Sequence, residues 1–191
     1  MNRQNKFNAI FIIIAAVALG LACSGVVQTE EANEIVERAN KKLDEAKELY
    51  TATETRNTKL FAANVNTVSQ LQDYKANKNS EAKSIVSDYE KVSEMLKDVS
   101  RQYEDISRLN LSEKYKDYAR LKSDEYATRA EAVAVRKGNA QAFLEIDDPA
   151  AMMTKFDENN SKSDRLFKDA EDIAAKTRKM EEEHKDLFKQ T

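Results

Sequence analysis

Residues 85–106 read IVSDYEKVSEMLKDVSRQYEDI, and two interleaved apolar series run through them, each with a spacing of seven residues. β-Branched residues occupy one position of this repeat, and larger side chains occupy the other. The first series is Ile85, Val92, Val99 and Ile106, and the second is Tyr89, Leu96 and Tyr103. Such a repeat is typical of a helix edge that packs as in a coiled coil. The sequence therefore predicts a long helix here, with one face buried against other helices.

A second apolar stripe precedes this stretch, and its steps of three and four keep the side chains on one helix face. It begins near Ala32 and continues for over forty residues without Gly or Pro. Its members are Val36, Ala39, Leu43, Ala46, Tyr50, Thr53, Asn57, Leu60, Asn64, Thr67, Leu71 and Tyr74. The polar members Asn57 and Asn64 leave open a kink or break near residues 57–66. Residues 77–80, Asn-Lys-Asn-Ser, give the first strong turn signal.

A third stripe follows the central stretch, and Ser112 is expected to cap the helix that carries it. The members of this stripe are Tyr115, Ala119, Tyr126, Ala130, Val133, Ala140 and Leu144. Gly138 and Asn139 form a weak point inside it. A helical Gly costs about 1 kcal/mol relative to Ala, which does not require the helix to end.

The clearest boundary of the chain is Asp147-Asp148-Pro149. An acid at the N-cap followed by Pro at the first helical position suits a helix start, because it satisfies free N–H groups and fixes φ. The fourth helix is predicted to follow. Its expected seam is Met152, Phe156, Asn159, Ser163, Leu166, Ala170, Ile173, Thr177, Met180, His184 and Leu187.

The composition of the chain supports a helical fold. The 191 residues contain three Gly and one Pro, whereas average usage would give roughly 13 and 10, so turn-rich β-architectures are excluded. We expect an all-α domain over residues 30–191: an elongated, antiparallel, coiled-coil-like bundle of about four long helices. The expected lengths are about 45, 30, 35 and 40 residues, or about 45–70 Å. The first helix is expected to overhang or bend, and its stripe would then be available for self-association.

Residues 1–22 differ from the rest of the chain. Arg3 and Lys6 form a positive start without acids, and residues 9–22, AIFIIIAAVALGLA, contain no charge. This apolar run is shorter than the roughly 20 residues of a membrane-spanning helix. The pattern predicts a secretory signal peptide over residues 1–22, followed by a tether over residues 23–29.

Cys23 is the single cysteine of the chain and follows the apolar run directly. The end of the run resembles the lipobox of bacterial lipoproteins, which places Leu, a small residue, Gly or Ala, and then Cys. Ala22 and Cys23 match the last two places, whereas Leu21 falls one place too late. The resemblance implies a diacylglyceryl group on the Cys23 thiol and an acyl chain, such as palmitate, on the freed amine. Ser24, in place of Asp, implies sorting to the outer membrane in a Gram-negative cell.

Ordinary signal peptidase offers a different interpretation of the same residues. Gly20 and Ala22 are the small residues that this enzyme needs three places and one place before its cut. Cys23 would then be a free thiol at the start of the mature chain. Both interpretations predict export.

Charge and motifs exclude several classes of protein. Cleavage after residue 22 removes Arg3 and Lys6 but no acid, so 34 acidic residues face 29 basic ones. Binding to nucleic acid needs a basic footprint, and we expect no such partner. The chain has no Gly-rich phosphate loop and no nucleophile elbow, and its one thiol is expected to be acylated. We therefore expect neither an enzyme nor a cofactor.

Glu181-x-x-His184 is half of the signature with which helical bundles hold two iron ions. The chain contains only one histidine, so the second half of that signature does not exist. His184 also falls on the expected seam of the fourth helix, where a core-edge imidazole is the commoner explanation. No metal site is predicted.

Five tyrosines in the middle of the chain form the candidate binding residues. They are Tyr89, Tyr103, Tyr115, Tyr118 and Tyr126. An aromatic body with a polar tip suits a ligand groove. Their helical spacing favours an alternative, in which they are ordinary seam residues of the core.

Two functions are consistent with these patterns. The preferred hypothesis is an exported lipoprotein, anchored in the membrane of the cell envelope, whose bundle is a structural or protein-interaction module. In a Gram-negative cell it would lie on the periplasmic or surface face of the outer membrane. Asn57, Asn64, Asn159 and Ser163 motivate a protein or polymer partner, because polar seam residues suggest core packing that a partner completes. The alternative is a carrier of small molecules or lipids with an apolar pocket between helices. The mature region resembles helical lipoproteins of unknown role.

Overall fold

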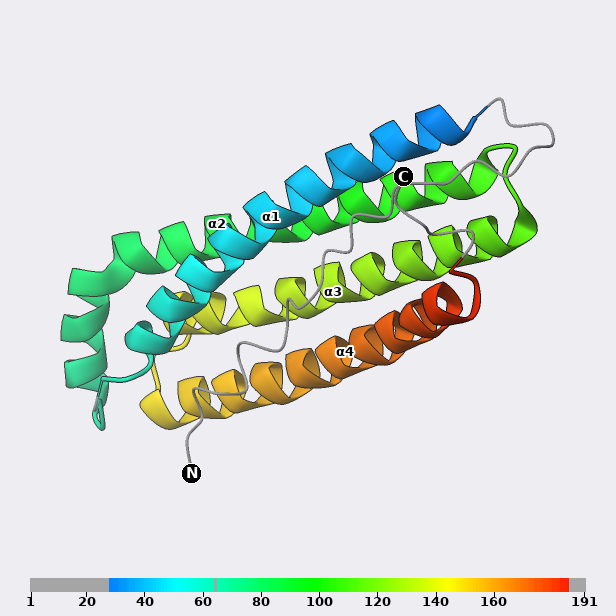
Figure 1. Ribbon diagram of the computed structural model, residues 1–191. Coiled ribbons are helices and arrows are strands. Elements are labelled where there is room, and N and C mark those ends of the chain that lie inside the picture. Colours follow the sequence, from blue (N-terminus) through cyan, green and yellow to red (C-terminus); the bar gives the residue numbers. More distant parts are fainter. Residues whose placement is uncertain (1–27, 64, 186–191) are drawn as a thin grey trace.

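The computed structural model describes residues 28–63 and 65–185, and all regular structure in these ranges is helical. The four helices are α1 (Thr29–Leu60), α2 (Val68–Arg108), α3 (Glu113–Glu145) and α4 (Pro149–Glu183). Figure 1 shows that they form one elongated bundle, as the sequence predicts. Residues 1–22, Cys23 and Leu187 lie outside the described residues.

Helices that follow one another in the chain pack side by side and run in opposite directions (Figure 1). In each neighbouring pair, the residue numbers on one helix fall as those on the other rise. The polar contacts with this pattern are Lys42–Asp98 and Arg56–Asp88 between α1 and α2, Ser93–Ala130 and Ser100–Ser123 between α2 and α3, and Tyr118–Glu181 and Arg136–Asp164 between α3 and α4. Because α1 and α3 are both antiparallel to α2, they are parallel to each other.

The predicted helix starts are confirmed. The Ser112 side chain accepts a hydrogen bond from the backbone N–H of Tyr115 at the start of α3. At the start of α4, Asp148 accepts from the N–H of Ala151 at 2.7 Å, and Pro149 is the first helical residue. These caps satisfy N–H groups that have no partner inside the helix.

The long first helix predicted from the continuous stripe is wrong, and the break near residues 57–66 is confirmed. α1 ends at Leu60, and Thr67 caps α2 by accepting from the N–H of Gln70 at 3.3 Å. The helices have 32, 41, 33 and 35 residues. The predicted stripe includes residues on both sides of the break. Thr67 belongs to it as the cap of α2, and Leu71 belongs to it as a core residue of α2. Neither role requires that α1 and α2 form one helix.

The turn predicted at residues 77–80 is also wrong, because these residues lie inside α2. Leu71 and Ala82 are fully buried on either side of them, and this tertiary packing outweighs the weak helix propensities of Asn and Ser. The Asn77 side-chain amide donates to the backbone carbonyl of Asp73 at 2.9 Å. Figure 1 shows the first turns of α2 at a steep angle to the rest of the helix, and side-chain bonds of this kind accompany helix bends.

The predicted seam of α2 is confirmed along its whole length. Every member of the two series in residues 85–106 is buried, none with more than 3% of its surface exposed. α3 packs against both α2 and α4, so it buries residues on two faces. Ala132 and Val133 are consecutive and both fully buried.

The seam of α4 differs from its predicted positions at every second member. Ser163, Ala170 and Thr177 are buried as expected, but Phe167 and Ala174 are buried where Leu166 and Ile173 were expected. The observed seam keeps the seven-residue repeat, but its steps run four and then three residues instead of three and then four. Both orders keep the side chains on one helix face, and the packing of α4 against α3 selects between them. On α3, Phe143 is buried and Leu144 is only partly buried.

Among the described helices, none has a stretch that is both apolar enough and long enough to cross a bilayer.

Candidate functional site

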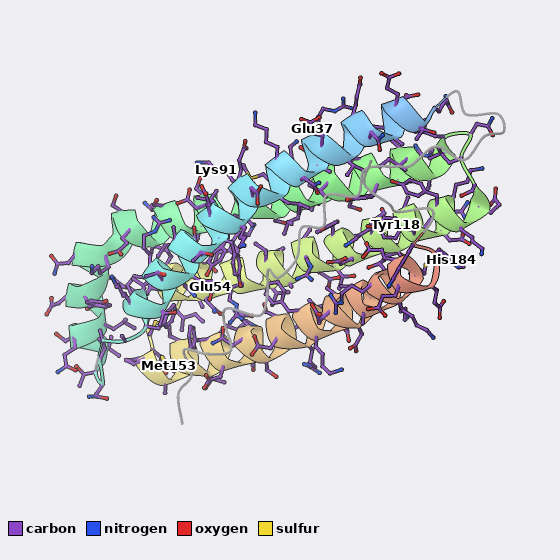
Figure 2. The ribbon with its side chains drawn as sticks, viewed as in Figure 1. Glu37, Glu54, Lys91, Tyr118, Met153 and His184 are labelled. Carbon is purple, nitrogen blue, oxygen red and sulfur yellow. The ribbon has the colours of Figure 1, made fainter. Side chains whose placement is uncertain are left out.

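The five candidate tyrosines fall into two groups along the bundle. Four of them gather where α2 ends and α3 begins, and we call Tyr103, Tyr115, Tyr118 and Tyr126 the tyrosine cluster. The rings of Tyr103 and Tyr126 stack with centroids 5.7 Å apart, and those of Tyr115 and Tyr118 lie 5.8 Å apart. Tyr89 lies nearer the middle of the bundle and is not part of this cluster. Figure 2 shows that Tyr118 and Glu54, which binds Tyr89, lie well apart along the rod.

All five tyrosine side chains belong to the core. Between 0% and 7% of their surfaces are exposed. Burial is the largest cause of a raised pKa for each of the five phenols, and nearby carboxylates add to it. The Tyr118 hydroxyl donates to Glu181 at 2.8 Å. Tyr89 and Tyr118 are therefore neutral phenols that donate hydrogen bonds to carboxylates within the bundle.

A buried ion pair lies beside the tyrosine cluster. The Arg129 guanidinium contacts the Glu125 carboxylate at 3.0 Å, and both side chains are almost completely buried. Lys122 also binds Glu125, at 3.1 Å, and its ammonium lies 5.6 Å from the ring centre of Tyr126. Two cations thus contact the buried Glu125 carboxylate. Arg129 also lies 3.5 Å from Glu171, and Lys122 faces an aromatic ring.

A second polar group crosses the bundle toward its opposite end. We call it the polar layer, and it consists of Glu54 and Asn57 of α1, Arg136 and Asn139 of α3, and Asn159, Asn160 and Asp164 of α4. Arg136 is its centre, because its side chain is only 4% exposed and it contacts both α1 and α4. This group is not among the sites predicted from the sequence.

Arg136 has three polar partners in the polar layer. Its Nη2 donates to Asp164 Oδ1 at 2.7 Å, its Nη1 donates to Asn160 Oδ1, and its Nε lies 3.5 Å from Glu54 Oε1. The hydroxyl of Tyr89 donates to the same Glu54 oxygen. Burial alone would lower the pKa of Arg136, but the Glu54 and Asp164 carboxylates raise it. The guanidinium is thus a fixed positive charge that joins α1, α3 and α4.

Aromatic rings lie on both sides of the polar layer along the bundle. On one side, Phe61 stacks on Phe156 at 4.2 Å and meets Phe143 edge-on at 6.1 Å. On the other side, Tyr50 meets Tyr89 at 6.1 Å and Phe167 at 5.8 Å. α4 thus contacts a ring of α1 on one side of the polar groups and the ring of Phe61, the C-cap of α1, on the other.

α1 and α3 keep the same register through the polar layer. The Phe61–Phe143 contact fixes one level, and the Glu54–Arg136 contact fixes another. Asn57 lies three residues after Glu54 and four before Phe61. Asn139 likewise lies three residues after Arg136 and four before Phe143. Since the two helices are parallel, the two asparagines occupy one level between these contacts.

The asparagines of the polar layer are only partly satisfied by protein atoms. Asn139 is fully buried, and its Nδ2 donates to Asn160 Oδ1 at 2.8 Å. Asn57 is 2% exposed. Asn57 Oδ1, Asn139 Oδ1 and Asn159 Nδ2 are buried and have no hydrogen-bond partner among the described residues. These three atoms are the most specific unexplained feature of the bundle.

A partner was predicted from four polar residues on the seams, and the structure describes three of them. The hydroxyl of Ser163 is buried and donates to the backbone carbonyl of Ala132 at 3.0 Å, so Ser163 is satisfied inside the chain. Asn57 and Asn159 point into the polar layer rather than to an outer surface. Asn64 lies outside the described residues. The Ser163 hydroxyl thus needs no partner outside the chain, and the completion of the packing by a partner stays a prediction.

The Glu181–His184 pair lies at the end of α4, where His184 is the C-cap. His184 Nδ1 lies 3.3 Å from the ammonium of Lys114, and Glu181 binds Tyr118. Within residues 28–63 and 65–185, no three His, Cys, Asp or Glu side chains are grouped so that they could hold a metal ion.

The sequence contains a weak signal for the polar layer. Arg136 lies three residues after Val133 and four before Ala140, so it falls on the predicted buried face of its helix. Glu54 follows Thr53, which is itself a member of the first stripe. A charged residue on a predicted seam is a candidate for a buried ion pair, but the sequence does not show which opposite charge it meets.

Comparisons of the chain with family models, with curated proteins and with solved structures found no match.

Proposed function

We propose that this chain is an exported lipoprotein, attached to a membrane of the cell envelope through Cys23, whose bundle is a structural or protein-interaction module. The observation that carries the proposal is the order of its parts: a positive start, a short apolar run, a single cysteine, and then a helical bundle. A leader of this kind predicts export. A cysteine at its end supplies the group that lipidation requires.

The anchor would hold the bundle close to the membrane. Residues 24–28 separate Cys23 from the first residue of α1, and five residues reach at most about 18 Å. Each acyl chain contributes about 0.8 kcal/mol per buried CH₂, and two or more chains give stable attachment. α4, with 35 residues, is about 50 Å long, so the far end of the bundle would stand well away from the lipid.

The surface of the bundle supports recognition through polar contacts. Val68 and Met153 are the large hydrophobic residues that are exposed among the described ones, at 46% and 38%. Pairs of opposite charge cover the sides of the helices, for example Glu34 with Arg38 and Lys168 with Asp172. A protein or polymer partner in the envelope would therefore meet a mixed, largely polar surface.

The anchor is tested by Cys23→Ser in the native host, with Ser24→Ala as the matched control. We expect the unchanged protein and S24A to incorporate labelled palmitate and to sediment with membranes. C23S should incorporate no palmitate and appear in the soluble fraction. An unmodified protein in the cytosol would overturn the proposal of export and anchoring together.

The interaction role needs its own experiment, because an anchored protein need not bind a partner. A photo-crosslinking residue is placed at exposed positions along the rod, such as Glu37, Lys91 and Met153 (Figure 2). A discrete cross-linked product in intact envelopes, from one face and not from the others, supports the proposal. Failure at every position would leave an anchored rod without the proposed partner and would overturn the interaction role.

A carrier of small molecules is a second candidate, favoured by the gathering of four tyrosines at one end of the bundle. Native mass spectrometry of the purified protein separates the two functions. A ligand that co-purifies with the protein, and is lost when Tyr103 and Tyr126 are changed to Leu, supports the carrier. A clean protein mass supports the interaction module.

A further inference from the structure

We propose that the polar layer binds internal water, held between Asn57 of α1, Asn139 of α3 and Asn159 of α4. The inference rests on three buried amide atoms without a partner among the described residues. It is independent of export and anchoring, because it depends only on the packing of the helices.

The unpartnered atoms have the hydrogen-bonding pattern that suits a water molecule. Asn57 Oδ1 and Asn139 Oδ1 are acceptors, and Asn159 Nδ2 is a donor. A water molecule donates two hydrogen bonds and accepts up to two, so it can serve both acceptors and the donor. Leaving such groups unpaired in the core would cost about 1–3 kcal/mol each, which a bound water avoids.

The position of the three atoms favours a shared site. Asn57 and Asn139 lie at one level between the Phe61–Phe143 and Glu54–Arg136 contacts. Asn159 Nδ2 lies over Gly138, 2.9 Å from the point where a Cβ at that glycine would be. Because Gly138 is the neighbour of Asn139 in α3, the donor and one of the acceptors approach the same turn of that helix.

Charge favours a neutral occupant over an ion. The charged groups of the polar layer are the Arg136 guanidinium, the buried Glu54 carboxylate and the Asp164 carboxylate, whose side chain is 68% exposed. Besides the three amide atoms, Arg136 Nε is buried without a hydrogen-bond partner among the described residues, although it lies 3.5 Å from Glu54 Oε1. The buried charges of Arg136 and Glu54 thus offset each other. A cation would lie beside the guanidinium and an anion beside two carboxylates, and either ion would lose its hydration for only a few amide contacts.

Aromatic rings flank the proposed site along the bundle. Phe61, Phe143 and Phe156 lie on one side of the polar layer, and Tyr50, Tyr89 and Phe167 lie on the other. Asn139 is fully buried and Asn57 is 2% exposed. A water molecule held between these two asparagines should therefore exchange more slowly than water at the surface.

Water relaxation dispersion on the purified protein tests the proposal, because it detects internal water that exchanges slowly. The test variant is Asn57→Leu/Asn139→Leu, and the matched control is Asn79→Leu on the exposed face of α2. We expect a dispersion from the unchanged protein, the same amplitude from the control, and a smaller amplitude from the double variant. Equal amplitudes in all three proteins would overturn the proposal, provided that circular dichroism shows the double variant to be folded.

A crystal structure of the unchanged protein gives the second measurement, which does not depend on the folding of a variant. We expect a density peak of one water molecule within hydrogen-bond distance of at least two of the three amide atoms. Direct pairing of the asparagine side chains with one another would overturn the proposal. So would an ion or a larger molecule at this position.

Discussion

The Nε atom of Arg136 on α3 lies 3.5 Å from Oε1 of Glu54 on α1. Both residues are buried, and their helices are parallel and not consecutive in the chain. The contact therefore joins two parts of the bundle that no short turn connects. It also fixes the level of α1 against α3, because a shift of one helical turn would separate the two charges.

Removal of one member of this pair is expected to be costly. Arg136→Met should lower the free energy of unfolding by about 3 kcal/mol, because it leaves the Glu54 carboxylate buried without its cation. Adding Glu54→Gln should restore at least about 1 kcal/mol of that loss. Chemical denaturation of the single and double variants measures both effects. The matched control is Arg120→Met, which breaks an exposed pair with Asp117 and should cost at most about 1 kcal/mol. Strictly additive effects of the two core substitutions would contradict the coupling.

Lys75 is expected to stabilise the junction between α3 and α4. Its ammonium donates to the backbone carbonyl of Ile146 and to Asp147 Oδ1, each at 2.8 Å, and its side chain is 13% exposed. Lys75→Met should cost about 1–2 kcal/mol of stability, since it removes a charged hydrogen bond to the carbonyl that follows α3. Thermal unfolding, with exposed Lys83→Met of the same helix as control, measures the difference. Equal melting temperatures for the two variants would show that Lys75 has no such role.

Gly138 and Asn159 are expected to be coupled. A Cβ at position 138 would lie 2.9 Å from Asn159 Nδ2 and 3.3 Å from its Cγ, so the asparagine side chain must move. In an Asn159→Ala background, Gly138→Ala should raise the stability by about 1 kcal/mol, the difference in helix propensity. In the unchanged background, the same substitution should gain less or destabilise the protein. Urea denaturation of the four proteins measures the cycle, and an identical gain in both backgrounds would exclude the contact.

The buried tyrosines predict loss of stability in alkali. Burial raises the pKa of Tyr89, Tyr118 and Tyr126 well above 10.0, the ordinary value. The unfolded chain releases these protons at lower pH than the folded protein. Stability is therefore complete below about pH 10 and falls as the pH rises above it. Phenolate absorbance and helical circular dichroism, followed together, should change in one cooperative transition. Ionisation of the buried tyrosines while the helices remain intact would contradict this prediction.

Much of the fold follows from patterns that act over short distances. The two series in residues 85–106 are buried as predicted, because spacing along one helix is enough to define its apolar face. Ser112, Asp148 and Pro149 start helices as predicted, because capping joins groups only three residues apart. The leader and Cys23 are also patterns of the sequence, and the proposal of an anchored protein depends on them.

Patterns along the chain did not predict the structure correctly where a tertiary contact outweighed a local preference. The stripe that passes through Leu60 and Leu71 does not show that the helix ends between them. Residues 77–80 look like a turn, but packing on both sides keeps them helical in α2. Local preferences are worth less than about 1 kcal/mol per residue, and the burial of one large side chain contributes about 1.5–3 kcal/mol.

The polar layer depends entirely on how the helices come together. The chain places Glu54, Arg136 and Asp164 on three different helices, and nothing in their spacing assigns one to another. Charged residues are 34% of the sequence, so many opposite pairs are equally compatible with it. The amino-acid order thus predicts a helical bundle, the starts of α3 and α4 and the apolar face of residues 85–106. It also carries the leader pattern on which the proposal of export depends. The assembled bundle selects which buried charges and amides meet, because their free energies depend on desolvation and distance in space.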